Sequence, residues 1–499
     1  MKIIRKLATS GVILTTGKRS WNFLRRLKRT VQHRREKPTA VTIEKLVAWS
    51  RGACSMPLAM QRQRVRGLNN DSRAIGNGEV FVAVSTDRDD GHRYVVSAFS
   101  RGAAAALVSK KKADMFSDED KKKLIMVDDP LVALRSMAQE YRKVLAVPII
   151  GITGSSGKTT ARNFIATVLK QTLKVGETVG NWNNNIGVPL SMLRFTGSEN
   201  VGVLEMGANH EHEIHVLSTM IRPTVGVITN IGYAHIGYFG SLENIARAKL
   251  EIIDGMDRNG FLLLNGDDRL LVKKAGRLKK KIVFFGFSSR CDVRARNVQL
   301  TNTKHLRFEV DSKEYKLSMP GRHFIYSALM AIYLGRYFGV EERLIKHALL
   351  TMRPIPLRGT IEKKSGVKFI VDCYNANPSS MKYAIRLLDD VGEKNGKVAI
   401  VGDMLELGKY SNRLHKALGT ELAKAGVDRV LAVGDFAEIV ASGAIKAGMK
   451  SRNVYVARNN AEALSMAKRL VVRPGDVALL KGSRGVHLET VFEGFGKQE

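Results

Sequence analysis

A glycine-rich turn between an apolar segment and a helix-like segment constrains this chain more than any other feature. Residues 147–153 read Val-Pro-Ile-Ile-Gly-Ile-Thr, an apolar run long enough for a buried strand. The turn at 154–160 reads Gly-Ser-Ser-Gly-Lys-Thr-Thr, and apolar residues then recur at helical spacing over 161–172. A strand, a glycine-rich turn and a helix in this order are the context that a phosphate-binding loop needs.

The turn carries the residue types that hold a nucleotide. Glycines let the backbone approach an anion, and N–H groups at a helix start point toward it. Lys158 would reach the outer phosphates, and the Thr159 hydroxyl would hold Mg²⁺. The strict pattern requires glycine where Ile152 stands, so the loop is a variant, and a plain turn with a surface lysine is the alternative. The residues predicted to bind the nucleotide are Gly154, Ser155, Ser156, Gly157, Lys158, Thr159 and Thr160.

The charge of the chain favours anionic partners. Its 499 residues suffice for two to four domains, and 44% apolar with 26% charged residues is typical of globular proteins. The formal net charge of +34 favours nucleotides, nucleic acid or anionic lipid. Cys54, Cys291 and Cys373 have neither metal-site nor disulfide spacing, which suits a reducing compartment, and we expect a cytoplasmic protein.

Residues 1–38 form a basic arm with three open interpretations. Residues 1–37 hold twelve Lys or Arg against one acid, Glu36, as an organelle transit peptide would. An interfacial helix would instead set Trp21 and Phe23 against basic neighbours and give weak affinity for anionic membranes. A solvated basic tail is the third and slightly favoured interpretation. A secretory signal is not expected, and no apolar run reaches the roughly 18 residues of a membrane span.

The segment after the arm, residues 39–146, alternates helix and strand signals. Helical patterns at 42–50 and 94–101 alternate with strand patterns at 79–84 and 104–108. This alternation predicts a small α/β domain. By itself, the Asp71-Ser72-Arg73 sequence in this segment is more typical of a turn or helix cap than of a binding site.

The central segment, residues 147–353, places polar residues at strand ends. A strand pattern at 200–204 ends at Glu205, where a magnesium-organising carboxylate belongs. Another at 225–228 leads through Asn230 to His235, and ligands bind at the carboxyl ends of parallel strands. The loop at 180–187 is rich in asparagine, which suits either ligand contacts or plain turn chemistry. A helical pattern at 241–256 carries Lys249.

The C-terminal segment, residues 354–499, predicts a doubly wound, Rossmann-like domain. Four strand patterns, at 367–371, 397–401, 429–433 and 477–480, are separated by helical segments. A charged residue follows each strand pattern within two positions. These residues are Asp372, Asp403, Asp435 and Lys481.

In their order and spacing, the motifs of these segments resemble the Mur ligase family over about residues 65–490. Each motif is weak alone, and the last ones point to the branch that adds D-alanyl-D-alanine. The shifted glycines of the phosphate loop are this family's form of it. The motifs are Asp71-Ser72-Arg73, Asp90-Gly91-His92, the loop at 151–159, the loop at 180–187, Glu205 to His210, Thr229-Asn230 with His235, Gly240-Ser241-Leu242, Ala248-Lys249, Pro320 to His323, Tyr374 to Pro378, residues 402–408 and Lys481 to Arg484.

The resemblance implies a three-domain α/β enzyme with a UDP-substrate domain, a P-loop ATPase domain with a mostly parallel sheet, and the Rossmann-like domain. It implies an ADP-forming amide ligase of peptidoglycan precursor synthesis. ATP would phosphorylate the terminal carboxylate of UDP-N-acetylmuramoyl-tripeptide, and the amine of D-alanyl-D-alanine would displace phosphate from the acyl phosphate. We expect a monomer with small-molecule substrates and no specific nucleic-acid partner.

The resemblance also assigns residues by motif. The implied catalytic residues are Lys158, Lys249, His235 and Arg358. The implied ligands of two Mg²⁺ are Thr159, Glu205, His235 and Lys249, the lysine as a carbamate, with an ordinary surface lysine as the alternative. Arg358 would lie near the ATP phosphates and Asp372 near the ribose. The implied substrate-binding residues are Ser72, which would lie near the UDP group, Asn183, Asn184, Tyr374, Asn375 and Asn377.

Some positions depart from the family pattern. Phe324 and Ser327 stand where asparagines are usual, which puts contacts with the nucleotide base in doubt. Thr86 and His212 replace usual glycines, and Val371 replaces the first acid of a common pair. The alternative functions are a sister ligase with another amine or peptide substrate and a nucleic-acid-binding ATPase. The second is suggested only by the net charge, because no recognition module is present.

Overall fold

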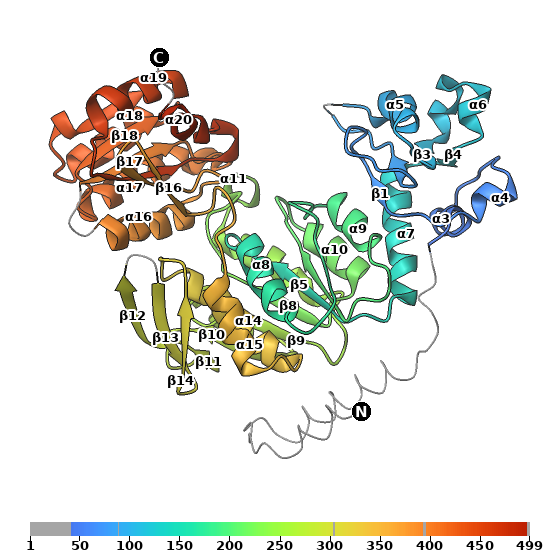
Figure 1. The fold of residues 1–499 in the computed structure, drawn as a ribbon, viewed down its shortest axis with the longest axis horizontal. Helices are drawn as coiled ribbons and strands as arrows, with labels where there is room; N and C mark the ends of the chain where they lie inside the picture. The colour runs from blue at the N-terminus through green and yellow to red at the C-terminus, as the bar shows by residue number, and fades with distance from the viewer. Residues whose placement is uncertain (1–40, 88, 303–304, 393–395, 497–499) are drawn as a thin grey trace.

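The computed structural model describes residues 41–87, 89–302, 305–392 and 396–496, so the basic arm at 1–38 lies outside the described residues. Within these ranges the chain forms β-sheets of four, seven, three and six strands. Figure 1 shows three lobes in a row, with the small three-stranded sheet beside the central one. Over the same ranges, no helix is both long and apolar enough to cross a membrane.

The N-terminal lobe is a parallel α/β unit, as the alternation of strand and helix signals predicts. The Thr42 hydroxyl caps the first helix by accepting a hydrogen bond from the backbone N–H of Lys45 at 3.4 Å. Asp71 accepts a hydrogen bond from the backbone N–H of Arg73 at 2.9 Å, which is the turn that the sequence suggests. The elements are α3 (Ile43–Ser50), α4 (Leu58–Gln61), β1 (Leu68–Asn69), β2 (Val80–Val82), α5 (Val95–Ser100), β3 (Ala105–Ser109), α6 (Asp118–Lys121), β4 (Leu124–Val127) and α7 (Pro130–Val144).

The central sheet is parallel throughout, in the order β11-β10-β9-β8-β5-β7-β6. The phosphate-loop strand β5 (Ile149–Thr153) lies inside this order, so the loop after it is flanked by the ends of β7 and β8. The other elements are α8 (Lys158–Leu169), β6 (Val175–Glu177), α9 (Gly187–Met192), β7 (Val201–Glu205), α10 (Glu213–Ile221), β8 (Val225–Ile228), α11 (Ile236–Phe239), α12 (Leu242–Leu250), β9 (Phe261–Asn265), α13 (Arg269–Ala275), β10 (Lys281–Gly286) and β11 (Val293–Arg294).

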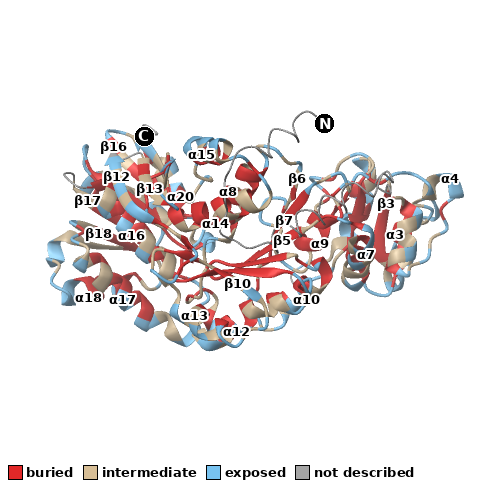
Figure 2. Cartoon of the chain, turned by 90° about the horizontal axis from the view of Figure 1, so that it is seen from below, coloured by how far each residue is buried: buried red, intermediate tan, exposed pale blue. Residues whose placement is uncertain are grey.

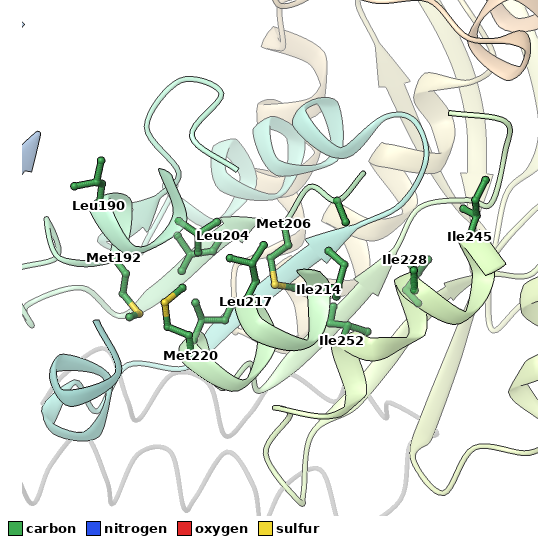
Figure 3. Close-up of a cluster of buried hydrophobic side chains, with 14 of the residues drawn as sticks. Leu190, Met192, Leu204, Met206, Ile214, Leu217, Met220, Ile228, Ile245 and Ile252 are labelled. Carbon is green, nitrogen blue, oxygen red and sulfur yellow. The ribbon is translucent and has the colours of Figure 1, made fainter. Parts of the chain in front are cut away.

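Both faces of the central sheet are buried, because successive side chains of a strand point to opposite faces. Ile150 and Ile152 pack toward α8 and α14 (Phe324–Tyr337), whereas Ile149 belongs to the cluster on the other face. Figure 3 shows that second cluster, in which side chains of α9, α10 and α12 meet those of β7 and β8. Figure 2 shows the same strands buried along their length. These two layers of helices fix the strand ends that carry the polar residues.

A small antiparallel sheet that the sequence analysis did not predict packs beside the central sheet. Its buried side chains, among them Phe308 and Tyr315, join the cluster under α14. Buried and half-buried residues alternate along its middle strand, so a strand was detectable there by its period of two. Its elements and the helices that follow are β12 (Arg296–Asn302), β13 (His305–Val310), β14 (Lys313–Leu317), α14 and α15 (Glu342–Thr351).

The C-terminal sheet has the order β15-β16-β20-β17-β18-β19, and β15 is its antiparallel edge strand. The remaining pairs are parallel, which confirms the doubly wound prediction. The elements are β15 (Thr360–Lys364), β16 (Val367–Val371), α16 (Pro378–Gly392), β17 (Lys397–Gly402), α17 (Ser411–Lys424), β18 (Arg429–Val433), α18 (Ala437–Lys446), β19 (Val454–Ala457), α19 (Asn460–Met466), β20 (Val477–Lys481) and α20 (Glu489–Gly494).

The helix expected at 241–256 is shorter in the structure. It ends at Leu250 and continues as a 3₁₀ turn at Glu251–Ile253. The chain then passes close to Ser218, where a Cβ at Gly255 would lie 2.0 Å from the Ser218 carbonyl oxygen. We propose that the domains divide as the sequence suggests, at 39–146, 147–353 and 354–499. Each of these segments then contains its own parallel or mostly parallel sheet.

Candidate active site

A cavity of about 600 Å³ lies where the carboxyl ends of the central strands face the C-terminal sheet. Its lining includes Arg135 of α7, the phosphate loop, the asparagine-rich loop and residues of the C-terminal lobe. Most of the residues predicted from the sequence therefore face one space. Three of them, Gly154, Ser72 and Lys249, do not line it. The predicted residues in its lining are Ser155, Ser156, Gly157, Lys158, Thr159, Thr160, Asn183, Asn184, Glu205, His235, Arg358, Asp372, Tyr374, Asn375 and Asn377.

The phosphate loop has a backbone that favours glycine at two positions. Gly154 has φ +140°, and a Cβ there would lie 2.0 Å from the hydroxyl of Thr229. Gly157 has φ +77° and precedes the first turn of α8, so the N–H groups of the helix start open into the cavity. Asn230 supports the loop, because its Oδ1 accepts a hydrogen bond from the backbone N–H of Ser156 at 3.1 Å.

Lys158 is half-buried in the loop, which argues against the alternative of a plain turn with a surface lysine. Its Nζ donates a hydrogen bond to the carbonyl of Gly154 at 2.9 Å, which holds the ammonium over the loop. Burial lowers the pKa of Lys158, while the nearby Glu205 carboxylate acts in the opposite direction. A cation held in this way is placed to meet the negative charge of a phosphate.

Glu205 has the properties of a cation ligand. It is only 1% exposed at the end of β7, and its Oε1 accepts a hydrogen bond from the Asn183 side-chain amide at 2.8 Å. Its Oε2 is buried and has no hydrogen-bond partner among the described residues. A buried carboxylate oxygen without a partner is unfavourable unless a cation or donor meets it.

Mg²⁺ fits this donor set. No group of three His, Cys, Asp or Glu side chains converges on a metal position anywhere in the described ranges. Mg²⁺ commonly binds through one or two carboxylates together with substrate phosphates and water. Glu205 and the Thr159 hydroxyl, both lining the cavity beside the phosphate loop, would supply the protein part of such a site.

Lys249 is not a surface lysine, so that alternative is wrong. It is 2% exposed on α12, and its Nζ donates a hydrogen bond to the carbonyl of Ala208 at 3.1 Å. Its ammonium lies 5.2 Å from the centre of the Phe239 ring. Burial, with a smaller effect from Lys158, lowers the pKa of Lys249 to about 7. Ala208 itself lines the cavity, so Lys249 lies one residue behind its wall.

His235 is held by the C-terminal lobe. It has φ +58°, immediately before α11, and its Nδ1 lies 2.5 Å from a carboxylate oxygen of Glu406. The backbone N–H of Gly237 also donates to the Glu406 carbonyl at 3.0 Å. The hydrogen bond with His235 lowers the pKa of Glu406. A carboxylate that binds Nδ1–H leaves Nε2 as the available ligand atom of the imidazole.

Two further contacts join the C-terminal lobe to the phosphate loop, and a third, between Arg358 and Tyr374, lies within that lobe. An Nη of Arg358 donates to the Thr159 hydroxyl at 3.1 Å, and its guanidinium lies 3.8 Å from the centre of the Tyr374 ring. The Asn377 amide donates to the Ser156 hydroxyl at 3.0 Å. Burial lowers the pKa of Arg358, which remains a cation because its ordinary pKa is far above neutrality. The loop and the C-terminal lobe thus form one site.

Asp372 is paired with a buried lysine. The Nζ of Lys481 donates to Asp372 Oδ2 at 2.6 Å and to the carbonyl of Asn375 at 2.9 Å. Burial raises the pKa of Asp372, and the Lys481 ammonium opposes that shift. Because Lys481 is almost fully buried, this ion pair fixes the position of Asp372 at the cavity wall.

Some predicted residues have structural contacts of their own. The Asn184 Oδ1 accepts hydrogen bonds from the backbone N–H groups of Ile186 and Gly187, at 3.1 and 2.8 Å, so part of this loop is turn chemistry. Ser72 is buried in the N-terminal lobe. His212 has φ +67°, a conformation that explains why glycine would suit its position.

The two positions where the family usually has asparagine lie in the site itself. Phe324 and Ser327 are buried and line the cavity, and the Phe324 ring lies 4.1 Å from the His323 ring. Sequence analysis placed Asn230, Glu406 and Lys481 within motifs but gave none of them a role in the site. The polar residues of the 402–408 motif were the available signal for Glu406.

Arg358→Lys should weaken ATP binding about 10- to 100-fold. A lysine cannot reproduce both the contact with Thr159 and the stacking on Tyr374, and a hydrogen bond to a charged group contributes roughly 1.5–3 kcal/mol. Calorimetric titration with ATP measures the dissociation constant. Arg386→Lys, an exposed position on α16, is the matched control and should bind ATP normally. Equal affinity in both variants would contradict this role of Arg358.

Comparison with known proteins relates the whole architecture to one group of enzymes. Residues 64–142 match the description "Mur ligase family, catalytic domain", residues 152–335 "Mur ligase middle domain", and residues 358–484 "Mur ligase, glutamate ligase domain". The chain is 33% identical over 455 residues to the UDP-N-acetylmuramoyl-tripeptide–D-alanyl-D-alanine ligase of Bacillus subtilis, covering 91% of this chain and 97% of that protein. The Escherichia coli protein of the same name is 33% identical over 431 residues, covering 85% and 92%.

Solved structures agree with these relatives. A crystal structure of MurF from Acinetobacter baumannii superposes with a TM-score of 0.81 at 28% identity, covering 92% of this chain and 99% of that one. MurF from Thermotoga maritima in complex with ADP superposes with a TM-score of 0.74 at 29% identity, covering 88% and 98%. The three-lobed α/β arrangement of this chain is therefore the arrangement of those ligases.

Proposed function

The chain belongs to the Mur ligase family, and we propose that it joins D-alanyl-D-alanine to UDP-N-acetylmuramoyl-tripeptide while ATP is cleaved to ADP and phosphate. The observation that carries this proposal is the cavity in which the phosphate loop meets Arg358, Tyr374 and Asn377 of the C-terminal lobe. Relatives named for this reaction align with nearly the whole chain. The product would be a precursor of peptidoglycan and hence of the cell wall.

The first chemical step would form an acyl phosphate. An oxygen of the tripeptide's terminal carboxylate attacks the γ-phosphorus of ATP, the bond from that phosphorus to the bridging oxygen breaks, and ADP leaves. Carboxylate and triphosphate are both anionic, so cations must reduce their repulsion. Lys158 binds the Gly154 carbonyl and Arg358 binds the Thr159 hydroxyl, so both would provide fixed positive charge at the phosphate loop.

The second step would form the amide. The amine of D-alanyl-D-alanine attacks the acyl carbon, the bond to the phosphate oxygen breaks, and inorganic phosphate and a proton are released. We place the dipeptide at the wall of the cavity that the C-terminal lobe forms, facing the acyl phosphate. Tyr374, Asn375 and Asn377 line that side of the cavity and would orient the amine.

Thr159 and Glu205 would hold one Mg²⁺, and His235 with a carbamylated Lys249 would complete a second site. Bound there, Mg²⁺ would neutralise phosphate charge as it develops. Asp372, fixed by Lys481, would contact the ribose of ATP. Ser72 would contact the UDP group from the N-terminal lobe.

A product-mass assay with purified enzyme tests the function. With ATP, Mg²⁺, UDP-N-acetylmuramoyl-tripeptide and D-alanyl-D-alanine, the expected product is the UDP-linked pentapeptide with one ADP and one phosphate per amide. Omitting either peptide substrate should remove the product. If another amine or UDP-linked peptide is used instead, the enzyme is a sister ligase. ATP hydrolysis stimulated by DNA or RNA alone would make it a nucleic-acid-dependent ATPase.

We further propose that the enzyme is cytoplasmic, because ATP and UDP-linked precursors are made in the cytoplasm. We also propose that it is a monomer. Cys54, Cys291 and Cys373 are free thiols in the structure, which is compatible with a reducing compartment. Sedimentation of the purified chain at several concentrations measures its oligomeric state, and a concentration-dependent mass would contradict the monomer.

Deleting residues 1–37 should leave ligase turnover in solution nearly unchanged. Every residue that we place at the active site lies between Ser72 and Lys481, so the arm contributes no group to the chemistry. The rate of ADP release with saturating substrates, compared with that of the full chain, is the measurement. A large loss of turnover in a truncated chain with unchanged thermal unfolding would show that the arm is part of the enzyme.

A further inference from the structure

Basic residues gather at the amino-terminal ends of the central strands, opposite the ends that face the cavity. Adjacent strands β10, β9, β8 and β5 are each preceded by a short segment, which before β5 includes the last residues of α7. These segments, 276–281, 257–260, 221–224 and 139–147, contain eight basic residues and two acids, Glu140 and Asp257. We call the eight the basic edge: Arg142, Lys143, Arg222, Arg258, Arg277, Lys279, Lys280 and Lys281.

Hydrogen bonds between these segments show that they lie next to one another. The Nζ of Lys280 donates to the carbonyl of Asp257 at 2.8 Å. The backbone N–H of Asp257 donates to the carbonyl of Pro223 at 3.0 Å, and an Nη of Arg142 donates to that of Arg222 at 3.1 Å. The basic edge is therefore continuous across the starts of four neighbouring strands, which at about 4.8 Å per strand spacing extends roughly 15 Å.

The positive charge of the basic edge is largely uncompensated. Among the described residues, Lys143 pairs with Glu140, and no other member of the basic edge forms an ion pair. All its members except Arg142 and Lys280 are exposed. Burial lowers the pKa of Arg142 to about 10, and the nearby Arg222 cation adds to this shift. Such a row favours a partner with many negative charges.

The partner that fits best is the surface of an anionic lipid bilayer. A single-stranded nucleic acid would call for aromatic side chains on which bases stack, yet the exposed aromatic residues in the described ranges are Tyr94 and Tyr238, outside these segments. The basic edge instead carries Val144, an apolar side chain that is 50% exposed beside Lys143. Closely spaced cations with an adjacent apolar side chain suit lipid headgroups.

We propose that the basic edge docks the folded enzyme onto anionic phospholipid membranes. The cavity lies at the carboxyl ends of the same strands, so a docked enzyme would keep its active site turned toward the aqueous phase. The docking surface does not depend on the proposed ligase activity and can be tested without it.

The test compares two full-length variants with equal charge change. The edge variant carries Arg258→Gln, Arg277→Gln, Lys279→Gln and Lys281→Gln, four exposed side chains that form no described hydrogen bond or ion pair. The control variant carries Lys424→Gln, Lys446→Gln, Lys450→Gln and Arg452→Gln, four exposed cations of the C-terminal lobe that are equally free of described contacts. Both retain the arm, so its contribution is the same in each.

Flotation with vesicles of 70% phosphatidylcholine and 30% phosphatidylglycerol measures the partition coefficient. We expect the edge variant to bind at least about tenfold more weakly than the unmodified chain and the control variant to change by less than about threefold. Binding should fall in high salt and be absent on pure phosphatidylcholine. Equal losses in the two variants, equal binding to uncharged vesicles, or a selective loss of double-stranded RNA binding in the edge variant would each overturn the proposal.

Discussion

Lys158→Ala should lower the ligation rate by about 10²–10³ without unfolding the protein. The ammonium of Lys158 is held over the phosphate loop by the carbonyl of Gly154, where it would meet the charge that develops on the transferred phosphoryl group. Removing a fixed cation from such a position costs several kcal/mol in the transition state. The measurement is kcat/KM for the tripeptide at saturating ATP and Mg²⁺.

Lys170→Ala at the far end of α8 is the matched control, because that lysine is exposed and pairs with Glu177. It should ligate at nearly the normal rate. Thermal unfolding of both variants separates lost chemistry from lost structure. If Lys158→Ala turned over at the rate of Lys170→Ala, the loop would not be the phosphate-binding element and the assignment of the cavity would fail.

Features that depend on neighbouring residues could be predicted from the sequence. The phosphate loop is one, because its strand, glycines and helix follow one another along the chain and each has its own local signal. Glu205 is another, since an acid at the end of an apolar strand must lie at the carboxyl end of a parallel sheet. The doubly wound C-terminal sheet follows in the same way from repeated strand and helix patterns.

Contacts between distant segments could not be predicted in this way. His235 and Glu406 are 171 positions apart, and nothing in either local sequence shows that one will hold the other. The environment of Lys249 is similar, because its burial results from the packing of α12 against the central sheet, whereas its own sequence suits an exposed helix equally well. Sequence patterns thus predict which groups react, whereas tertiary packing determines their ionisation.

Lys249→Ala should be nearly inactive. Its buried amine has a pKa of about 7, so a large fraction is unprotonated near neutrality, whereas an ordinary lysine is almost fully protonated there. An unprotonated amine reacts with CO₂ to form a carbamate with release of one proton, which turns the side chain into an anion able to bind Mg²⁺. Turnover assays with and without a small carboxylate, which could fill the vacated position, should show partial rescue of the variant.

Arg247→Ala is the control on the same helix, since Arg247 is exposed and pairs with Glu211, and it should remain active. An active Lys249→Ala enzyme would decide against the carbamate. So would a ¹³C spectrum after equilibration with ¹³CO₂ that shows no Lys249-dependent carbamate signal, a readout that does not depend on turnover.

The sign of the pH dependence follows from the pKa of Lys249. Folding lowers this pKa from 10.5 to about 7, so between these pH values the unfolded chain binds the proton more readily than the folded chain does. The free energy of unfolding therefore decreases as pH falls through that range. Below pH 7 the folded amine is protonated and carbamate formation declines, so removing CO₂ should depress wild-type activity most at low pH.

Lys249→Met, which buries no charge, should therefore unfold at a temperature equal to or above that of the unmodified chain in CO₂-free buffer, even though it is inactive. A lower unfolding temperature would mean that Lys249 stabilises the fold as a cation and that its role is structural.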